Sequence, residues 1–203
     1  MANPNSPDTP KDYSSDPDVL LMLEAQKGNT ASFEALLRKY FSRIFNFAYR
    51  YLGSRESAED IAQETFIRVH RSLASYSPQS KFQTWLYVIA RNLCLNELRN
   101  NKNRAYSLDG MLETEDGEMP AQFADHNAAD PANELVNKET LAKLIEVIES
   151  LPENQRTAVL LQRFDGLSYD EIAKVLGCSL QAVKSLLNRA KESLKDKLSS
   201  LPE

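Results

Sequence analysis

The chain has 203 residues, enough for one or two small domains with apolar cores. A hydrophobic content of 42% and a charged content of 26% are typical of globular proteins. A polar, proline-rich start without a signal-peptide pattern argues against secretion, and no run nears the ~18 apolar residues of a membrane span. Cys94 and Cys178 form neither a disulfide framework nor a metal-ligand spacing. We therefore expect a cytoplasmic protein that does not insert into a membrane and binds no metal or cofactor.

The net charge of −5 conceals a strongly uneven distribution along the chain. Residues 1–19 carry −3, and residues 20–104, with thirteen basic and seven acidic side chains, carry +6. Residues 105–134 hold eight acids and no base, whereas residues 135–203 hold ten of each. A basic segment, an acidic segment and a neutral segment are thus expected to play different roles.

Helical periodicity dominates the whole chain, and sustained two-residue alternation is missing. Residues 1–17 are predicted to be a disordered tail. Helices are predicted at about 18–27, 31–52, 55–75 and 81–101. After residues 105–133, which have no apolar stripe, an apolar stripe begins at Leu141 and breaks at Leu151-Pro152; further helices are predicted at 153–164, 168–176 and 179–197. The predicted fold is all-α, with two small helical domains (18–104 and 134–198) joined by a flexible acidic linker, 105–133.

The segment from Ser168 onward has the features of a helix-turn-helix. Ser168 and Glu171 fit a capping box, and Gly177 stands where a left-handed turn residue is needed. Ser179 can cap a second helix whose inner face holds Val183, Leu186 or Leu187, and Ala190. Its outer face offers donors suited to a major groove: Gln181, Lys184, Ser185, Asn188, Arg189 and Lys191. An ordinary helical hairpin with a solvated polar face is the alternative.

The helix predicted at 55–75 has a core face and an unusual outer face. Ala58, Ala62, Thr65, Val69 and Leu73 share the core side. Polar residues surround an isoleucine on the opposite side, which comprises Asp60, Gln63, Ile67 and His70, flanked by Glu64 and Phe66. This pattern indicates a protein-binding surface, although a single stray surface isoleucine is also common.

The next helix combines aromatic and basic side chains. Phe82, Leu86, Ile89 and Leu93 are expected in the core, with Trp85 at its edge. Thr84, Tyr87, Arg91, Asn92 and Lys102 are expected on the outside. Aromatic rings beside cations and amides suit single-stranded DNA, whose bases stack and whose phosphates need cations. The alternative is that Trp85 and Tyr87 serve only core and rim packing.

Three segments together resemble a known family. SAEDIAQETFIRVHRSL, then FQTWLYVIARN, then LPENQRTAVLLQRFDGLSYDEIAKVLGCSLQAVKSLLNRAKESL after the acidic gap are similar to sigma-70 family sigma factors of bacterial RNA polymerase. The likeness is strongest to the extracytoplasmic-function (ECF) group, which keeps only sigma regions 2 and 4. It extends from about Val19 to Lys197, nearly the whole chain.

This resemblance implies residue roles and partners. The β′ clamp helices of core polymerase would contact Asp60, Gln63, Glu64, Phe66, Ile67 and His70. A base flipped from the −10 element would be held by Ser77, Pro78, Gln79, Ser80, Lys81 and Phe82, and strand separation would involve Thr84, Trp85, Tyr87, Arg91 and Asn92. The −35 element would be read by Gln181, Lys184, Ser185, Asn188, Arg189 and Lys191. Further implied partners are the β flap and an anti-sigma factor, possibly a membrane-anchored one.

Two positions depart from the family pattern. Leu186 stands where the family often has arginine, and Asn188 where aromatic or histidine residues are frequent.

Two other classes of protein are alternatives to a sigma factor. A stand-alone helix-turn-helix regulator would bind its operator without polymerase. An enzyme is disfavoured, since neither His70 nor His126 has a triad partner or metal-ligand neighbour and no phosphate-binding glycine loop occurs.

Overall fold

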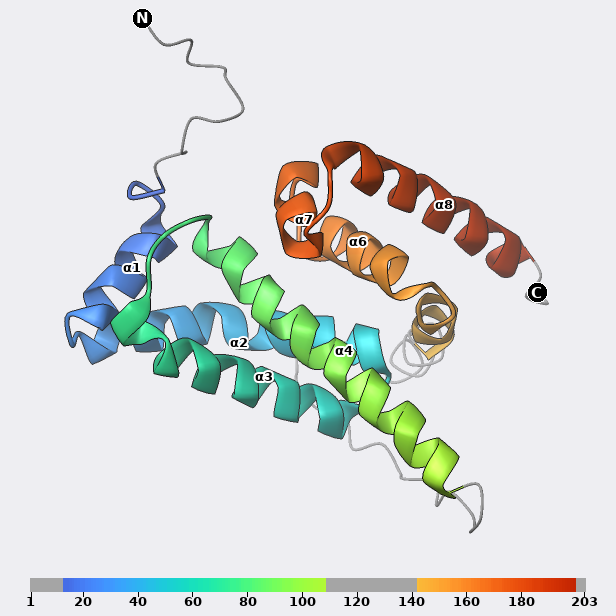
Figure 1. Cartoon of the computed structure of the whole chain (residues 1–203), viewed down its shortest axis with the longest axis horizontal. Helices are drawn as coiled ribbons and strands as arrows, with labels where there is room; N and C mark the ends of the chain where they lie inside the picture. The colour runs from blue at the N-terminus through green and yellow to red at the C-terminus, as the bar shows by residue number, and fades with distance from the viewer. Residues whose placement is uncertain (1–12, 109–141, 200–203) are drawn as a thin grey trace, which may run out of the picture.

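The computed structural model describes residues 13–108 and 142–199, and these ranges contain helices but no strand. The all-α prediction is therefore confirmed. In chain order the elements are α1 (Pro17–Gln26), α2 (Thr30–Leu52), α3 (Arg55–Arg71), the 3-10 turn η1 (Leu73–Ser75), α4 (Phe82–Leu108), a helix at residues 142–149, α6 (Glu153–Arg163), α7 (Tyr169–Leu176) and α8 (Leu180–Ser199) (Figure 1).

Most helix boundaries follow local capping signals. Asn29 caps α2 by accepting the Ser32 N–H, and Ser54 caps α3 by accepting the Ser57 N–H. Gly53 ends α2 with a φ of 70°, a left-handed conformation that glycine adopts without strain.

Three predicted boundaries need correction. The third helix ends at Arg71 rather than 75, because the chain tightens into η1 and the Ser72 hydroxyl donates back to the Val69 carbonyl at 2.8 Å. Helix α4 continues to Leu108, so the first residues of the predicted linker are helical. The predicted disordered tail, residues 1–17, extends too far, because α1 begins at Pro17 and Tyr13 accepts a hydrogen bond from Lys174. Residues 1–12 and 109–133 of the tail and linker lie outside the described residues.

Helices α1 to α4 form a bundle around α2. Its centre holds fully buried aromatic and aliphatic side chains, including Ile44, Phe47 and Leu86. The Phe47 ring meets Tyr87 edge-on at 5.3 Å between centroids, which joins α2 to α4. This bundle supports the α3 surface and the start of α4, where the candidate site residues lie.

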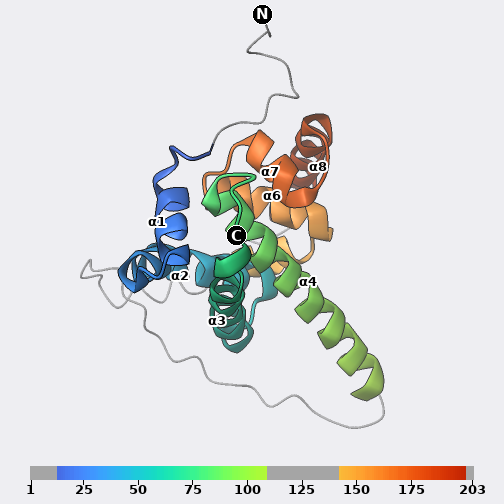
Figure 2. The same ribbon diagram turned by 60° about the vertical axis from the view of Figure 1, so that its left-hand side comes forward.

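Helices α6 to α8 form the second helical unit, and it packs directly against the first. Helix α6 lies against α2 and α7 lies against α4 (Figures 1 and 2). One continuous hydrophobic cluster includes Tyr51 and Tyr87 of the first unit with Leu161 and Val175 of the second. The two predicted domains therefore share a core in this structure, which the sequence pattern did not indicate.

Candidate nucleic-acid interface

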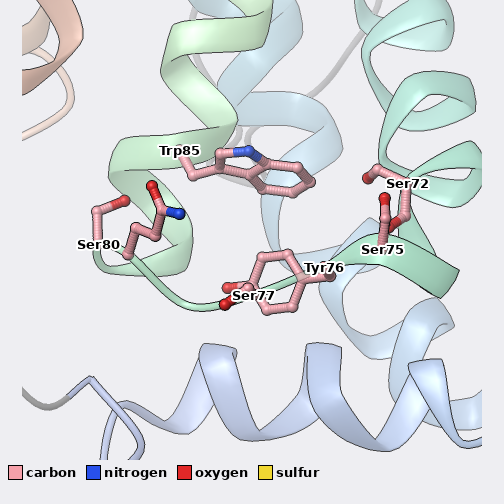
Figure 3. A pocket seen from close by; sticks show the side chains of 7 residues that line it. Ser72, Ser75, Tyr76, Ser77, Ser80 and Trp85 are labelled. Carbon is pink, nitrogen blue, oxygen red and sulfur yellow. The ribbon is translucent and has the colours of Figure 1, made fainter.

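A pocket of about 270 Å³ lies where η1, the following loop and the first turn of α4 meet. It is lined by Ser72, Ser75, Tyr76, Ser77, Gln79, Ser80 and Trp85. Figure 3 shows Trp85 on one side, facing Tyr76 and Ser77 across the hollow. The structure thus brings together three of the residues predicted to hold a flipped base, and it adds Trp85 to the same wall.

The pocket wall is built from supported aromatic side chains. The Tyr76 ring meets Trp85 edge-on at 5.1 Å, and Phe82 packs behind Trp85 at 5.9 Å. Phe82 is fully buried and does not line the pocket, so it cannot contact a base there as predicted. It instead packs against Trp85 in the pocket wall. The Tyr76 hydroxyl is buried without a hydrogen-bond partner in the described part of the chain, and burial raises its pKa to about 12.

Gln26 of α1 holds the loop that carries the pocket. Its side-chain amide donates to the carbonyl of Ala74 at 3.3 Å and to that of Tyr76 at 3.2 Å. Ser72, Ser75, Tyr76 and Gln26 were all missed from the sequence. The serine-rich run at 72–80 was a signal, but assigning the helix as far as residue 75 hid it.

Two residues expected on the outside of α4 are buried. Thr84 is 2% exposed and Tyr87 is completely buried. Helix α7 packs against α4, and the Tyr87 ring meets Phe47 of α2. The prediction that Thr84 and Tyr87 lie on the outside of α4 is therefore wrong. The alternative, in which Tyr87 packs in the core, is correct for that residue. Asn92 is exposed, as predicted.

The Tyr87 hydroxyl donates to the carboxylate of Asp165, in the turn between α6 and α7. Burial raises the pKa of Asp165 to about 6, while the Tyr87 hydrogen bond and the charges of Arg50 and Arg43 on α2 offset part of the rise. Its second oxygen, Oδ2, is buried with no hydrogen-bond partner among the residues described. The carboxylate is thus held in a poorly solvated position between the two helical units.

Two cations predicted to contact DNA, Lys81 before α4 and Arg91 within it, also contact the second unit. The Lys81 Nζ lies 2.9 Å from Oε1 of Glu171, which raises the lysine pKa. Burial raises the pKa of Glu171, but hydrogen bonds from Ser168 and Lys81 outweigh this effect and leave it below its usual value. Arg91 donates to Oδ1 of Asn154 at 2.8 Å. In this arrangement both cations are engaged by protein groups.

The outer face of α3 agrees with its prediction except at one residue. Asp60, Gln63, Ile67 and His70 are exposed, and the Ile67 side chain is 44% exposed. Phe66, in contrast, is only 4% exposed and packs on Phe41 with ring centroids 6.1 Å apart, so it lies in the core. Glu64 is paired with Arg68 at 2.8 Å. The face is available to a partner through its exposed members.

Helices α7 and α8 have the predicted helix-turn-helix geometry. Ser168 and Glu171 form the capping box, and Gly177 ends α7 with a φ of 64°. Ser179 accepts the Ala182 N–H at 3.2 Å at the start of α8. Ile172 and Val175 form the buried inner face of α7, with exposed fractions of 0% and 3%.

The outer face of α8 is open to solvent. All six side chains predicted to read duplex DNA are exposed: Gln181, Lys184, Ser185, Asn188, Arg189 and Lys191. Helix α8 lies on the far side of the second unit from α1 to α4 (Figure 1). The close packing of the two units therefore leaves this face free.

Other kinds of site find no support in the described ranges. Residues 13–108 and 142–199 contain no cluster of three or more histidine, cysteine, aspartate or glutamate side chains placed to bind a metal ion. No described helix is both long and apolar enough to cross a bilayer. Cys94 is buried and Cys178 half-buried, and both are free thiols.

Comparisons with known proteins agree with this organisation. The Sigma-70 region 2 family matches residues 36–104, and the Sigma-70 region 4 family matches residues 141–194. The RNA polymerase sigma-H factor of Pseudomonas aeruginosa is 34% identical over 91% of this chain and 95% of its own length. The ECF RNA polymerase sigma-E factor of Escherichia coli K12 is 35% identical over the same shares of the two chains.

Two solved structures have a similar fold. CnrH in complex with the cytosolic domain of CnrY matches with a TM-score of 0.69 and 21% identity, over 91% of this chain and 99% of that one. The sigma factor RpoE of Bartonella quintana, solved with the anti-sigma factor NepR, matches with a TM-score of 0.63 and 23% identity, over 84% and 98%. The chain contains both sigma regions in this order, and its relatives match it over nearly their full length. It therefore belongs to the ECF group of the sigma-70 family, the transcription initiation factors of bacterial RNA polymerase.

Proposed function

We propose that the two helical units divide promoter recognition between them, with residues 18–104 acting as sigma region 2 and residues 134–198 as region 4. The exposed face of α3 binds the β′ clamp helices of core polymerase, with Ile67 as its apolar centre. The pocket beside Trp85 takes a base flipped out of the −10 element, and α8 reads the −35 duplex. Region 4 is held by the β flap.

The observation that carries this assignment is the pocket itself. Trp85 and Tyr76 provide aromatic surface against which a base can stack, and the serine hydroxyls and Gln79 provide polar groups for its edges. Removing a base from the duplex costs a few kcal/mol, which such contacts can offset. The exposed donors on α8 supply the second, double-stranded half of the same recognition.

Run-off transcription with purified core polymerase tests the proposal. We expect the chain to direct specific starts on fragments of its own genome, and to lose this activity when Trp85 is replaced by alanine. No transcript above that of core enzyme alone would contradict the function.

The α3 surface can be tested by core-polymerase capture. Ile67→Glu places a charge at the centre of the exposed face and is expected to abolish capture. Leu20→Glu is the matched control, because Leu20 is 48% exposed on α1, outside the proposed surface. Equal capture by both variants would exclude this face as the polymerase contact.

We further propose that the chain acts in the cytoplasm under the control of a membrane-anchored anti-sigma factor. RpoE of Bartonella quintana was solved with an anti-sigma factor, and CnrH was solved with the cytosolic domain of CnrY, a partner with a distinct cytosolic part. The test uses the cytoplasmic domain of a membrane protein encoded beside this gene. It should bind the chain and stop run-off transcription; inhibition only by a soluble neighbour would contradict the anchoring.

A further inference from the structure

Helix α4 continues beyond the bundle that supports its first half. Figures 1 and 2 show its C-terminal end projecting past α2 and α3. Ala90 and Cys94 are completely buried, whereas Arg99, Asn100 and Asn101 are all exposed. At about 100° per residue, Asn101 points in nearly the same direction as Ala90 and Cys94. The far end of the helix has therefore left the core, and its side chains are accessible to a partner.

One face of α4 connects this projecting end to the pocket. Relative to Trp85 in the pocket wall, Asn92, Asn96 and Arg99 lie within about 40° on either side around the helix axis. All three are exposed, and none has a hydrogen-bond or ion-pair partner in the described part of the chain. We refer to Asn92, Asn96 and Arg99 as the asparagine face. A nucleic acid that enters the pocket at Trp85 lies on the side of α4 that carries this face.

The chemistry of the asparagine face differs from that of the pocket. Proteins hold single strands by stacking bases on aromatic rings, and the asparagine face contains no aromatic ring. An asparagine amide combines donors with an acceptor and matches the edge of adenine in a major groove, while arginine binds phosphates and guanine. The change along the helix, from aromatic groups to amides and a guanidinium, therefore matches a change in the DNA from single strand to duplex.

Charge and length also favour duplex DNA as the partner. From Leu98 to Leu108 the sequence contains three basic residues and no acidic one. At 1.5 Å per residue, Trp85 and Arg99 are separated by about 21 Å along the helix axis. A duplex rises by about 3.4 Å per base pair, so this length corresponds to about six base pairs. The asparagine face is thus long enough to contact several base pairs beside a flipped base.

We propose that Asn96 reads a base edge, and that Arg99 binds a phosphate, in the duplex that borders the melted −10 element on the side leading to the −35 element. This inference rests on the proposed function of the pocket. It extends recognition of the −10 region from a flipped base into paired DNA, through two residues outside the set predicted from the sequence.

Two asparagines on opposite sides of α4 provide a matched pair of variants. Asn96→Ala removes the proposed base contact, and the variant should fold because alanine favours a helix more than asparagine does. Asn101→Ala is the control, since Asn101 is equally an exposed asparagine but lies about 140° away from Asn96 around the helix axis. Arg99→Gln removes the proposed phosphate contact.

Each full-length variant is bound to core polymerase and titrated with two labelled DNA probes, with fluorescence anisotropy as the readout. Both probes come from a promoter that wild type uses in run-off transcription. The fork probe joins the single-stranded −10 segment to a duplex that stops short of the −35 element, and the second probe is the −10 single strand alone.

Asn96→Ala should weaken binding to the fork probe by about five- to thirtyfold and lose discrimination at one base pair of the duplex. Arg99→Gln should weaken fork binding equally on every duplex sequence and lower the slope of log K against log salt by about one. Neither change should alter binding to the single strand, and Asn101→Ala should match wild type on both probes.

Wild-type affinity of Asn96→Ala for the fork probe would overturn the inference, as would an equal loss on both probes, because the residue would then act through the pocket. Reduced capture of core polymerase by Asn96→Ala or Arg99→Gln would also overturn it, since the asparagine face would then bind the enzyme. Trp85→Ala, in contrast, should lose affinity for both probes. If wild type starts transcription but Asn96→Ala binds the fork normally, only the duplex contact is refuted; if wild type starts none, the proposed function fails and this inference with it.

Discussion

Replacing Asp165 by asparagine removes a charge from the contact between α4 and the second helical unit while retaining an acceptor for Tyr87. The groups facing this carboxyl are the Tyr87 hydroxyl from α4 and Arg50 and Arg43 from α2. Burial dominates over them and raises the pKa of Asp165 from 3.8 to about 6. The charged carboxylate is therefore disfavoured where it lies, and opening the two units rehydrates it.

The magnitude follows from this shift. A rise of about two units corresponds to roughly 3 kcal/mol in favour of the neutral carboxyl in the closed form, with the two units packed together. Because the Asp165 side chain is only half-buried, we reduce this to about 1–2 kcal/mol. In wild type this contribution to closure is fully present below the ordinary pKa and is lost as the pH rises through about 6. Asparagine is never charged, so the variant should remain closed at neutral pH. Its ratio of closed to open molecules should exceed that of wild type by about five- to thirty-fold.

Small-angle scattering and the fluorescence anisotropy of a labelled DNA single strand, at about pH 5 and about pH 8, provide the assay. Wild type should be more open, and bind the strand more tightly, at the higher pH than at the lower. Asp165→Asn should be as closed at the higher pH as at the lower. Glu192→Gln, which removes a charge from an exposed position on α8, should follow wild type. A variant that is more open than wild type at about pH 8 would refute the reasoning, because the carboxylate would then be stabilising closure.

Three further predictions concern the other parts of the recognition surface. Arg189→Ala should weaken promoter binding by ~1–3 kcal/mol at one −35 base position in a set of promoter variants; an equal loss on every sequence would contradict direct base reading. Gln26→Ala removes both donors to the pocket loop and should weaken single-strand binding by about threefold. Gln26→Glu, which cannot donate when ionised, should match it, and wild-type affinity in that variant would exclude the positioning role. Gly177→Ala should lower the free energy of unfolding in urea by about 1 kcal/mol, since a φ of 64° is strained for alanine even though no atom lies within 4 Å of the new methyl group; unchanged stability would mean that the turn relaxes to another conformation.

Features that depend on neighbouring residues could be predicted from the sequence. The capping box of Ser168 and Glu171, the left-handed Gly177 and the Ser179 cap are interactions within one or two helical turns. The exposed face of α8 follows from helical periodicity in the same way. Such short-range interactions follow directly from residue spacing, which is why the helix-turn-helix was predicted correctly, whereas the ends of α3 and α4 were not.

Burial at the edge of a helix could not be predicted in this way. Phe66 was assigned to the outer flank of α3, yet Phe41 of α2 covers it. The pocket was only partly found, since Ser72 and Gln26 reach it through a turn and through α1. A helical wheel gives the direction of a side chain from its own axis, but the elements that cover it come from distant parts of the chain.

By itself the sequence determined that the fold class is all-α, that the chain carries a helix-turn-helix, and that its segments match sigma regions 2 and 4. The packing of those regions on each other was decided only by the tertiary structure. Tyr87 looked like an exposed aromatic residue, but Asp165, 78 residues further along the chain, turns it into a buried donor. No local pattern encodes that contact, because it depends on the apolar surfaces of α2, α4, α6 and α7 meeting in a single core.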